Sequence, residues 1–348
     1  MAVYRAPPRA DAPLTAPQTG SAPLRPLVTA PSDAPSPFAR DVVDGLAARP
    51  RSIPSKYFYD ARGSALFDEI TRLDAYYPTR TERQILTTHA DAIADAIGWR
   101  SALIEYGSGS SDKTRILLDA LHARRALSAY VPIDISAEYL ATVAEDLRRA
   151  YPGLPILPVA ADYTRGVDLP KLPDDTERRV MFFPGSTIGN LTPGEARTFF
   201  HDLAETLGPG GRLVLGSDLA KDPEVLERAY DDPEGITAAF NLNLLTRLNR
   251  ELGADADLAA WRHSARFNAA ESRVEMHLES RERQDLTVCG RTFSFDAGET
   301  IHTENSYKYA PGRLAELASE AGFQLRQRWT DPDRWFAVES YHLHTHSA

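Results

Sequence analysis

The sequence has its clearest chemical signal in the segment SALIEYGSGSSDKT, which spans residues 101–114. Here a short apolar run breaks at Gly107, Ser108 and Gly109 and then opens a helix-like segment, as α/β proteins do where they hold a nucleotide-like ligand. Asp134 follows about 25 positions after Gly109, at the end of the next apolar run, where a ribose diol needs a carboxylate acceptor. Asp112 stands in place of the third glycine of a dinucleotide fingerprint and would repel a pyrophosphate. The segment therefore predicts an adenosyl ligand other than NAD.

Four more residues follow neighbouring apolar runs and could contact such a ligand or its reaction partner. Lys113 could offer its charge to a carboxylate, and Asp162 with Tyr163 could supply an acceptor and an aromatic face for an adenine ring. Each has an ordinary alternative, since Lys113 could be a solvated helix residue and Asp162 a turn former. Asn190, in FPGSTIGNLTP, could grip an amine and a carboxylate together, or simply cap the helix expected from Pro193.

Composition limits the function classes. The chain has 348 residues, of which 43% are hydrophobic, and its 39 basic against 49 acidic residues give a net charge of −10. This charge argues against nucleic acid and anionic membranes as partners and favours a small-molecule substrate. Cys289 is the only cysteine, which excludes an internal disulfide and a thiolate metal cluster, so we expect no metal and a reducing, cytoplasmic location. Cys289 itself reads as a buried structural thiol in a strand.

The elements that must position these residues alternate along the chain. Residues 1–38 carry nine prolines and are expected to form a disordered Pro/Ala-rich tail. Helical spacing is expected at 39–48, 64–73, 79–97, 137–150, 193–207, 234–252 and 311–321. Strands are expected at 103–106, 130–135, 156–160, 180–183, 212–217, 273–280, 286–295, 324–329 and 335–342. The last two strands are joined by so short a turn that they must pair antiparallel.

This order predicts an α/β fold with a Rossmann-like sheet that ends in an antiparallel hairpin, and an α+β insertion between about 220 and 309. Such an outline resembles the class I S-adenosylmethionine (SAM)-dependent methyltransferases. The adenosyl ligand would then be SAM, held by Gly107, Lys113, Asp134, Asp162 and Tyr163. We expect a SAM-binding domain of residues 81–218 and 310–348, and a substrate-binding domain of residues 39–80 and 219–309.

Longer strings sharpen the resemblance. They are KYFYDARGSALFDEIT, AYYPTRTE, FPGSTIGNLTP, GSDLAKD, RAYDDPEGITAAFN, RVEMHL and HTENSYK, and the resemblance that they carry runs over about residues 41–342. Together they resemble the histidine Nα-methyltransferases of ergothioneine biosynthesis. The resemblance implies three successive methyl transfers from SAM to the α-amine of L-histidine, giving hercynine. It also implies that Tyr76, Asn190 and Tyr230 hold the amine and carboxylate of histidine, that Tyr59 lies close by, and that Asn190 and Tyr59 serve catalysis. Separately, we expect the enzyme to be a monomer.

The side chain of the substrate would then fall to Glu304, Asn305 and Ser306. An imidazole has two ring nitrogens, so one carboxylate and one hydroxyl can satisfy both, which an indole or phenyl ring cannot match. The structural alternative, an ion pair between Glu304 and Lys308, requires a helix, whereas residues 300–309 look extended. Two other functions remain open: methylation of another amino acid or small amine, and a nucleotide-dependent oxidoreductase or non-catalytic adenosyl binder.

Overall fold

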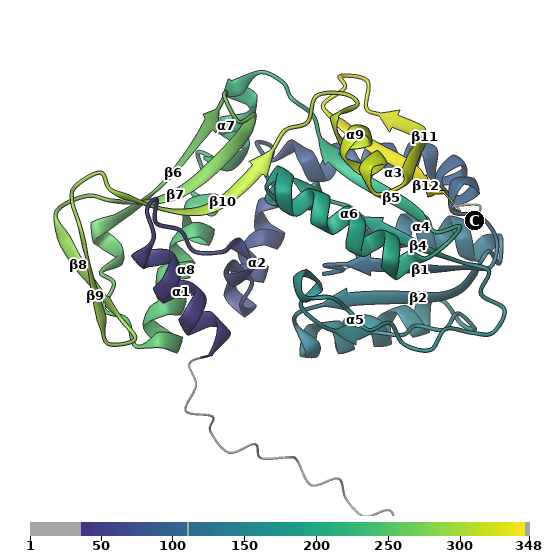
Figure 1. Cartoon of the computed structure of the whole chain (residues 1–348), viewed down its shortest axis with the longest axis horizontal. Helices are drawn as coiled ribbons and strands as arrows, with labels where there is room; N and C mark the ends of the chain where they lie inside the picture. Colours follow the sequence, from purple (N-terminus) through teal and green to yellow (C-terminus); the bar gives the residue numbers. More distant parts are fainter. Residues whose placement is uncertain (1–35, 110, 345–348) are drawn as a thin grey trace, which may run out of the picture. The chain divides into compact units, whose positions relative to one another are not determined.

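The computed structural model describes residues 36–109 and 111–344 (Figure 1). The expected tail lies outside these residues up to position 35, and the first helix, α1 (Pro37–Ala47), begins at the end of the predicted tail. Within the described residues, no helix has both the length and the apolar character needed to cross a membrane.

A seven-stranded sheet forms the larger part of the fold, in the order β11-β12-β5-β4-β1-β2-β3. The five strands from β5 to β3 are parallel, whereas β12 is antiparallel to both of its neighbours. The predicted parallel sheet with an antiparallel terminal hairpin is therefore confirmed. Its strands are β1 (Ser101–Tyr106), β2 (Leu127–Asp134), β3 (Val159–Ala160), β4 (Arg178–Phe183), β5 (Arg212–Asp218), β11 (Phe323–Thr330) and β12 (Phe336–Leu343).

Helices cover both faces of this sheet (Figure 1). One face packs on α3 (Tyr77–Ile97), α4 (Asp112–Ala123) and α5 (Ala137–Ala150), and the other on α6 (Pro193–Leu207) and α9 (Arg313–Glu320). The central strand β1 is consequently buried at every position, which explains its unbroken apolar run. Because strands β5, β4, β1, β2 and β3 are parallel, their carboxyl ends all lie at the same edge of the sheet.

A second group of elements surrounds a three-stranded antiparallel sheet, β10-β7-β6, and a two-stranded hairpin, β8-β9. Their side chains share one hydrophobic core with α1, α2 and α8. The elements are α2 (Ala61–Ile70), α7 (Pro223–Tyr230), α8 (Ile236–Leu252), β6 (Trp261–Asn268), β7 (Arg273–Ser280), β8 (Gln284–Val288), β9 (Arg291–Phe295) and β10 (Thr300–Tyr307). From Pro37 onward the chain forms a single compact unit.

The two sheets meet where the chain leaves the large sheet and later returns to it. The backbone N–H of Tyr309 donates to the carbonyl oxygen of Asp218 at 3.1 Å, and that of Ala220 donates to the carbonyl of Tyr309 at 3.1 Å. The end of β5 and the segment after β10 thus run side by side, although they lie about 90 residues apart in sequence. This junction is the part of the fold that positions the candidate site.

Three sequence-based expectations are wrong. Residues 286–295 belong to a hairpin of two strands instead of one strand, because Cys289 and Gly290, with φ of 50° and 72°, make the two-residue turn between β8 and β9. Cys289 is therefore exposed and is not a buried thiol. The strand expected at 156–160 is reduced to β3, with an isolated bridge at Ile156.

Candidate functional site

The glycine turn after β1 has the geometry that ligand approach requires. Gly107 and Gly109 both adopt positive φ, 65° and 48°, and no atom lies within 4 Å of where a Cβ would stand on either residue. The Ser108 Oγ is buried beside them and has no hydrogen-bond partner among the residues that the structure describes. A backbone open on one side, next to an unsatisfied buried hydroxyl, is suited to a polar ligand.

Asp134 and the glycine turn are in direct contact. The Asp134 carboxylate accepts hydrogen bonds from the backbone N–H groups of Gly109 and Ser136, both at 3.0 Å. The parallel pairing of β1 and β2 produces this contact, because it aligns the ends of the two strands. The structure therefore brings the predicted ribose acceptor and the predicted glycine turn together.

Lys113 projects from the first turn of α4 toward a buried acid that sequence reasoning missed. Its Nζ donates to Glu82 Oε2 at 2.7 Å, and the Glu82 carboxylate also accepts the backbone N–H of Gly185 at 2.9 Å. Glu82 is fully buried on α3, at a position where the helical spacing calls for an apolar residue. An acid on the apolar face of a helix was the available signal in the sequence. Glu82 thus links the loop after β4 to Lys113.

Asp162 and Tyr163 lie past the end of β3. Asp162 caps the short 3-10 helix η2 (Tyr163–Arg165) by accepting the N–H of Thr164 at 3.0 Å. The turn-forming role that the sequence also allowed for Asp162 is therefore present. Lys56 Nζ lies 3.7 Å from the other Asp162 oxygen. The ring of Tyr163 stacks on Tyr106 with centroids 5.0 Å apart and planes 7° apart, and its burial raises the pKa of its phenol to about 12.

Asn190 and Glu304 form the most informative contact of the site. Asn190 ends the 3-10 helix η3 (Thr187–Asn190), and its Nδ2 donates to Glu304 Oε1 at 3.2 Å. The helix-cap alternative for Asn190 is wrong, because Thr192 caps α6 through a capping box with Glu195. Gly189 permits the approach, since a Cβ there would lie 2.9 Å from the carbonyl oxygen of Tyr307 on β10.

The environment of Glu304 opposes its ionisation. Burial raises the pKa of this carboxyl to about 7, and the nearby Lys308 ammonium and the Asn190 hydrogen bond only partly offset that effect. The predicted extended conformation is confirmed, because Glu304 lies within β10 and Lys308 is paired elsewhere. Strand alternation sends Ser306 to the same face as Glu304 and Asn305 to the opposite face. The structure thus does not bring Asn305 to the other two side chains, and its buried Oδ1 has no hydrogen-bond partner within residues 36–109 and 111–344.

Three tyrosines lie around Glu304. The rings of Tyr76 and Tyr230 meet edge to face with centroids 6.0 Å apart, and Tyr59 packs against Phe67 and Phe240. Burial, with added repulsion from the Glu304 charge, raises the pKa of all three phenols far above 10. They are therefore neutral hydrogen-bonding groups.

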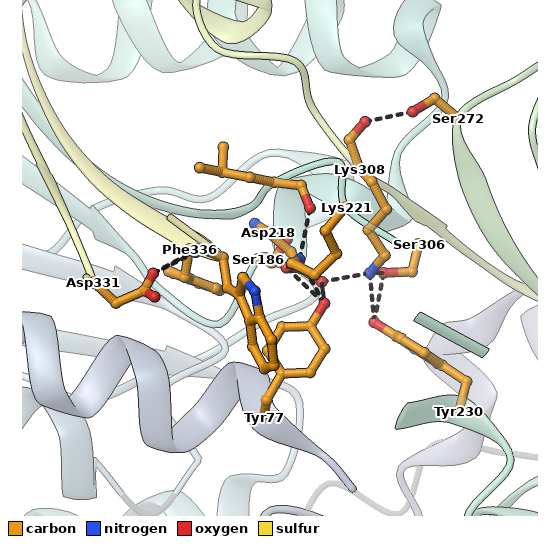
Figure 2. Close-up of polar contacts among 12 residues, drawn as sticks. Tyr77, Ser186, Asp218, Lys221, Tyr230, Ser272, Ser306, Lys308, Asp331 and Phe336 are labelled. Atoms are coloured by element: carbon orange, nitrogen blue, oxygen red, sulfur yellow. Dashed lines mark hydrogen bonds and ion pairs between the residues drawn. The ribbon is translucent and has the colours of Figure 1, made fainter. Parts of the chain in front are cut away.

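A buried polar network lies behind Tyr230 and Ser306 (Figure 2). Lys308 Nζ donates to Ser306 Oγ at 2.7 Å, to the Tyr230 hydroxyl at 2.9 Å and to Asp218 Oδ2 at 2.8 Å. Asp218 also accepts hydrogen bonds from Tyr77 and Lys221. Sequence reasoning gave none of Asp218, Lys221 and Tyr77 a role, and considered Lys308 only as an ion-pair partner of Glu304. No local pattern could have found them, because their side chains come from α3, β5 and the end of β10.

The sheet order, the antiparallel final hairpin and the acid held against the glycine turn together define a class I SAM-dependent methyltransferase. Comparison with known proteins narrows this class. A sequence profile described as histidine-specific, SAM-dependent methyltransferase matches residues 38–343, and the chain belongs to that family. The predicted family, enzyme class and methyl donor are thereby confirmed. Within the described part of the chain, no group of three or more His, Cys, Asp or Glu side chains could hold a metal ion.

Individual relatives cover most of the chain. It is 48% identical to a histidine N-alpha-methyltransferase of Mycolicibacterium smegmatis, across 84% of this chain and 91% of that one. It is 47% identical to a histidine N-alpha-methyltransferase of Mycobacterium tuberculosis, across 84% and 90%. Ergothioneine biosynthesis protein 1 of Neurospora crassa is 31% identical across 81% of this chain, which corresponds to 32% of that larger protein.

Proposed function

We propose that this chain transfers methyl groups from SAM to the α-amine of L-histidine, in three successive steps that give hercynine, and so performs the first step of ergothioneine biosynthesis. The family membership supports the methyl donor and the amino acid. The names of the relatives above support the Nα position and the pathway.

One observation carries the assignment to this site: the hydrogen bond between Asn190 and Glu304. Asn190 belongs to the loop after β4, at the same edge of the large sheet as the glycine turn after β1. Glu304 belongs to the three-stranded sheet. Because the two side chains touch, one small ligand can contact both the loop after β4 and the inserted elements. Free histidine, with its backbone amine at one end and an imidazole at the other, suits this arrangement.

The residues around the glycine turn fit SAM. Gly107 leaves room for close approach, the Ser108 hydroxyl awaits a partner, and Asp134 can exchange its backbone contacts for ribose hydroxyls. Lys113 can hold the methionine carboxylate while Glu82 fixes its position. Asp162 and the free face of Tyr163 can receive the adenine. SAM supplies an activated methyl group on a positive sulfonium.

The inserted elements and the tyrosines would then orient the amine. Asn190, Tyr76 and Tyr230 can hold the amino and carboxylate groups of histidine, with Tyr59 close by. The amine must be neutral to attack, and buried surroundings favour the neutral amine because desolvation lowers an amine pKa. After each transfer the amine must lose a proton before the next attack. The faces of Tyr59, Tyr76 and Tyr230 suit the growing quaternary ammonium, since aromatic rings attract cations.

We propose the same division of labour for the domains. Residues 81–218 and 310–348 would bind SAM, and residues 39–80 and 219–309 would bind the substrate. The separate hydrophobic cores of these two groups of elements support this division. We further propose a cytoplasmic monomer. In support, the large hydrophobic side chains exposed among the described residues are few: Trp99, Ile135, Tyr139 and Leu258.

Mass spectrometry of the product tests the proposal. The purified chain is incubated with SAM and an equimolar mixture of the twenty amino acids. We expect mono-, di- and trimethylated histidine to appear in turn, with fragmentation placing every methyl group on the α-nitrogen. Methylation of a ring nitrogen, or of another amino acid in preference to histidine, would refute it.

A further inference from the structure

Lys308 is a buried ammonium whose hydrogens are all committed. Its side chain and that of Asp218 are fully buried, and the two groups pair at 2.8 Å. An ammonium has three N–H donors and no acceptor, and those of Lys308 go to Asp218, Tyr230 and Ser306. A buried ion pair often adds little net stability. The more specific effect of the Lys308 charge is on the two hydroxyls that it contacts, those of Tyr230 and Ser306.

Those neighbours also bond to each other. The Tyr230 hydroxyl and Ser306 Oγ are 2.7 Å apart, so one donates to the other. Either hydroxyl could be the donor; we assign this role to Tyr230 because a phenol is the better donor, an aliphatic hydroxyl is the better acceptor, and the Tyr230 oxygen already accepts from Lys308. Ser306 Oγ then accepts from both Tyr230 and Lys308, which fills both of its lone pairs. Only its own O–H remains, and that group can only donate.

The anchor of this arrangement is Asp218 at the junction of the two sheets (Figure 2). Its carboxylate accepts from Lys308, Lys221 and Tyr77, and its backbone N–H donates to Ser186 Oγ at 2.9 Å. The two ammonium groups hold the pKa of Asp218 below its usual value despite complete burial. A charged Asp218 keeps the Lys308 ammonium aimed at Ser306, whereas Lys221 touches neither Ser306 nor Tyr230.

We propose that Lys308 is a positioning residue that makes Ser306 an obligatory hydrogen-bond donor, and so restricts the site to the neutral imidazole of histidine in a single tautomer. The ring N–H then faces the Glu304 carboxylate and the unprotonated ring nitrogen faces the Ser306 hydroxyl. This inference rests on the proposed function, because it assigns the protonation state of the same substrate in the same site.

The consequence is a loss of histidine affinity in acid. If Glu304 is protonated, its carbonyl oxygen can still accept from the ring N–H, but that bond loses the charge that strengthens it and histidine binds more weakly. If the ring is protonated, its second N–H meets a hydroxyl that cannot accept. The charged or titratable groups around Glu304 and Ser306 are Lys308 on the segment after β10, Asp218 on β5, Tyr76 just before α3, Tyr77 on α3, Tyr230 on α7, Tyr59, and Lys221.

The size of the loss follows from two protonations. Glu304 titrates near 7 in the empty site, and a histidine ring in water titrates near 6.5. If only the doubly deprotonated combination binds, affinity falls on the order of 300-fold between pH 8 and pH 5.5. If one shared proton is tolerated, the fall over the same range is only about tenfold.

Calorimetric titration of histidine into the protein saturated with S-adenosylhomocysteine, from pH 8 to pH 5.5, tests the proposal. We expect the steep fall for the unaltered chain and the shallow fall for Lys308→Met, which frees a lone pair on Ser306. Lys221→Met is the matched control, since it removes the other ammonium on Asp218 and should keep the steep profile. Tyr230→Phe also frees a Ser306 lone pair, so it should give the shallow fall even if Lys308→Met does not fold.

The outcomes separate this inference from the proposed function. A Lys308→Met profile that keeps its steepness and only shifts its midpoint would mean that Lys308 acts through charge alone, and would overturn the inference. So would a steep profile for Tyr230→Phe, or a Lys221→Met profile as shallow as that of Lys308→Met. Absence of histidine binding by the unaltered chain would overturn the proposed function as well, whereas binding with a shallow profile refutes the inference alone.

Discussion

Replacing Glu304 by glutamine should make the empty protein more stable and its substrate binding weaker. The side chain is nearly isosteric, and its Oε1 can still accept from Asn190 Nδ2. What changes is the charge, which the protein buries beside three tyrosines. If Glu304 serves binding at a cost in stability, its replacement should raise the free energy of unfolding and lower the affinity for histidine.

The magnitude follows from the pKa of Glu304, which burial raises from 4.5 to about 7. An acid whose pKa is raised in the folded state destabilises that state at high pH. The cost grows as pH rises from about 4.5 to 7, and is complete above 7. At 1.36 kcal/mol for each pKa unit, it is about 3 kcal/mol, and partial exposure of Glu304 reduces it to about 2 kcal/mol.

Urea denaturation at pH 8 and near pH 5 measures this effect. We expect Glu304→Gln to raise the free energy of unfolding by about 2 kcal/mol at pH 8 and by little near pH 5. Histidine affinity at pH 8 should fall about 10- to 100-fold, because a hydrogen bond to a charged group is worth about 1.5–3 kcal/mol.

Glu275→Gln provides a control of opposite sign. Hydrogen bonds from Asn268, Arg273 and His277 lower the pKa of Glu275 to about 2, against the effect of burial. Its contribution to stability is present above pH 4.5 and is lost as pH falls toward 2, so its removal should destabilise the protein at pH 8. Equal unfolding free energies for Glu304→Gln and the unaltered chain at pH 8 would refute the account of Glu304.

Three further substitutions probe the rest of the site. Asn190→Ala should abolish histidine methylation in a radiolabel assay while SAM affinity, measured by calorimetry, changes less than about threefold, since Asn190 contacts Glu304 and not the glycine turn. Gly189→Ala should lower kcat and cost about 1–3 kcal/mol in urea denaturation, because its Cβ would lie 2.9 Å from the Tyr307 carbonyl and push η3 off β10. Lys113→Met should weaken SAM binding by about 10-fold or more while sparing histidine affinity, and an unchanged SAM affinity would remove Lys113 from the proposed SAM site.

Local sequence was sufficient for much of the fold. Helices α5 and α6 begin and end where the apolar spacing and the Gly208 stop predict, and the Asp331 turn forces the last two strands to pair antiparallel. The glycine turn and Asp134 could also be paired in advance, because neighbouring parallel strands end at the same edge. Each of these features depends on a few consecutive residues or on one strand repeat.

The β8-β9 hairpin shows where local reasoning failed. Apolar residues on both sides of Cys289 suggested one continuous strand, and the single glycine after it was not read as a turn. A two-residue turn needs positive φ at both positions, which glycine adopts freely and cysteine seldom does. Only Gly290, the second of the two turn residues, is therefore of a type that indicates such a turn.

Sequence alone determined the class of sheet, the ligand-binding turn and the identity of the polar residues at the strand ends, because backbone periodicity and turn chemistry act over short distances. Tertiary structure decided which polar and charged side chains meet. Glu82 reaches Lys113 across 31 positions, Asn190 reaches Glu304 across 114, and Lys308 reaches Asp218 across 90. The physical reason is that a charge in a protein interior is stable only beside its partner, and that partner is chosen by how sheets and helices pack, not by neighbours in the chain.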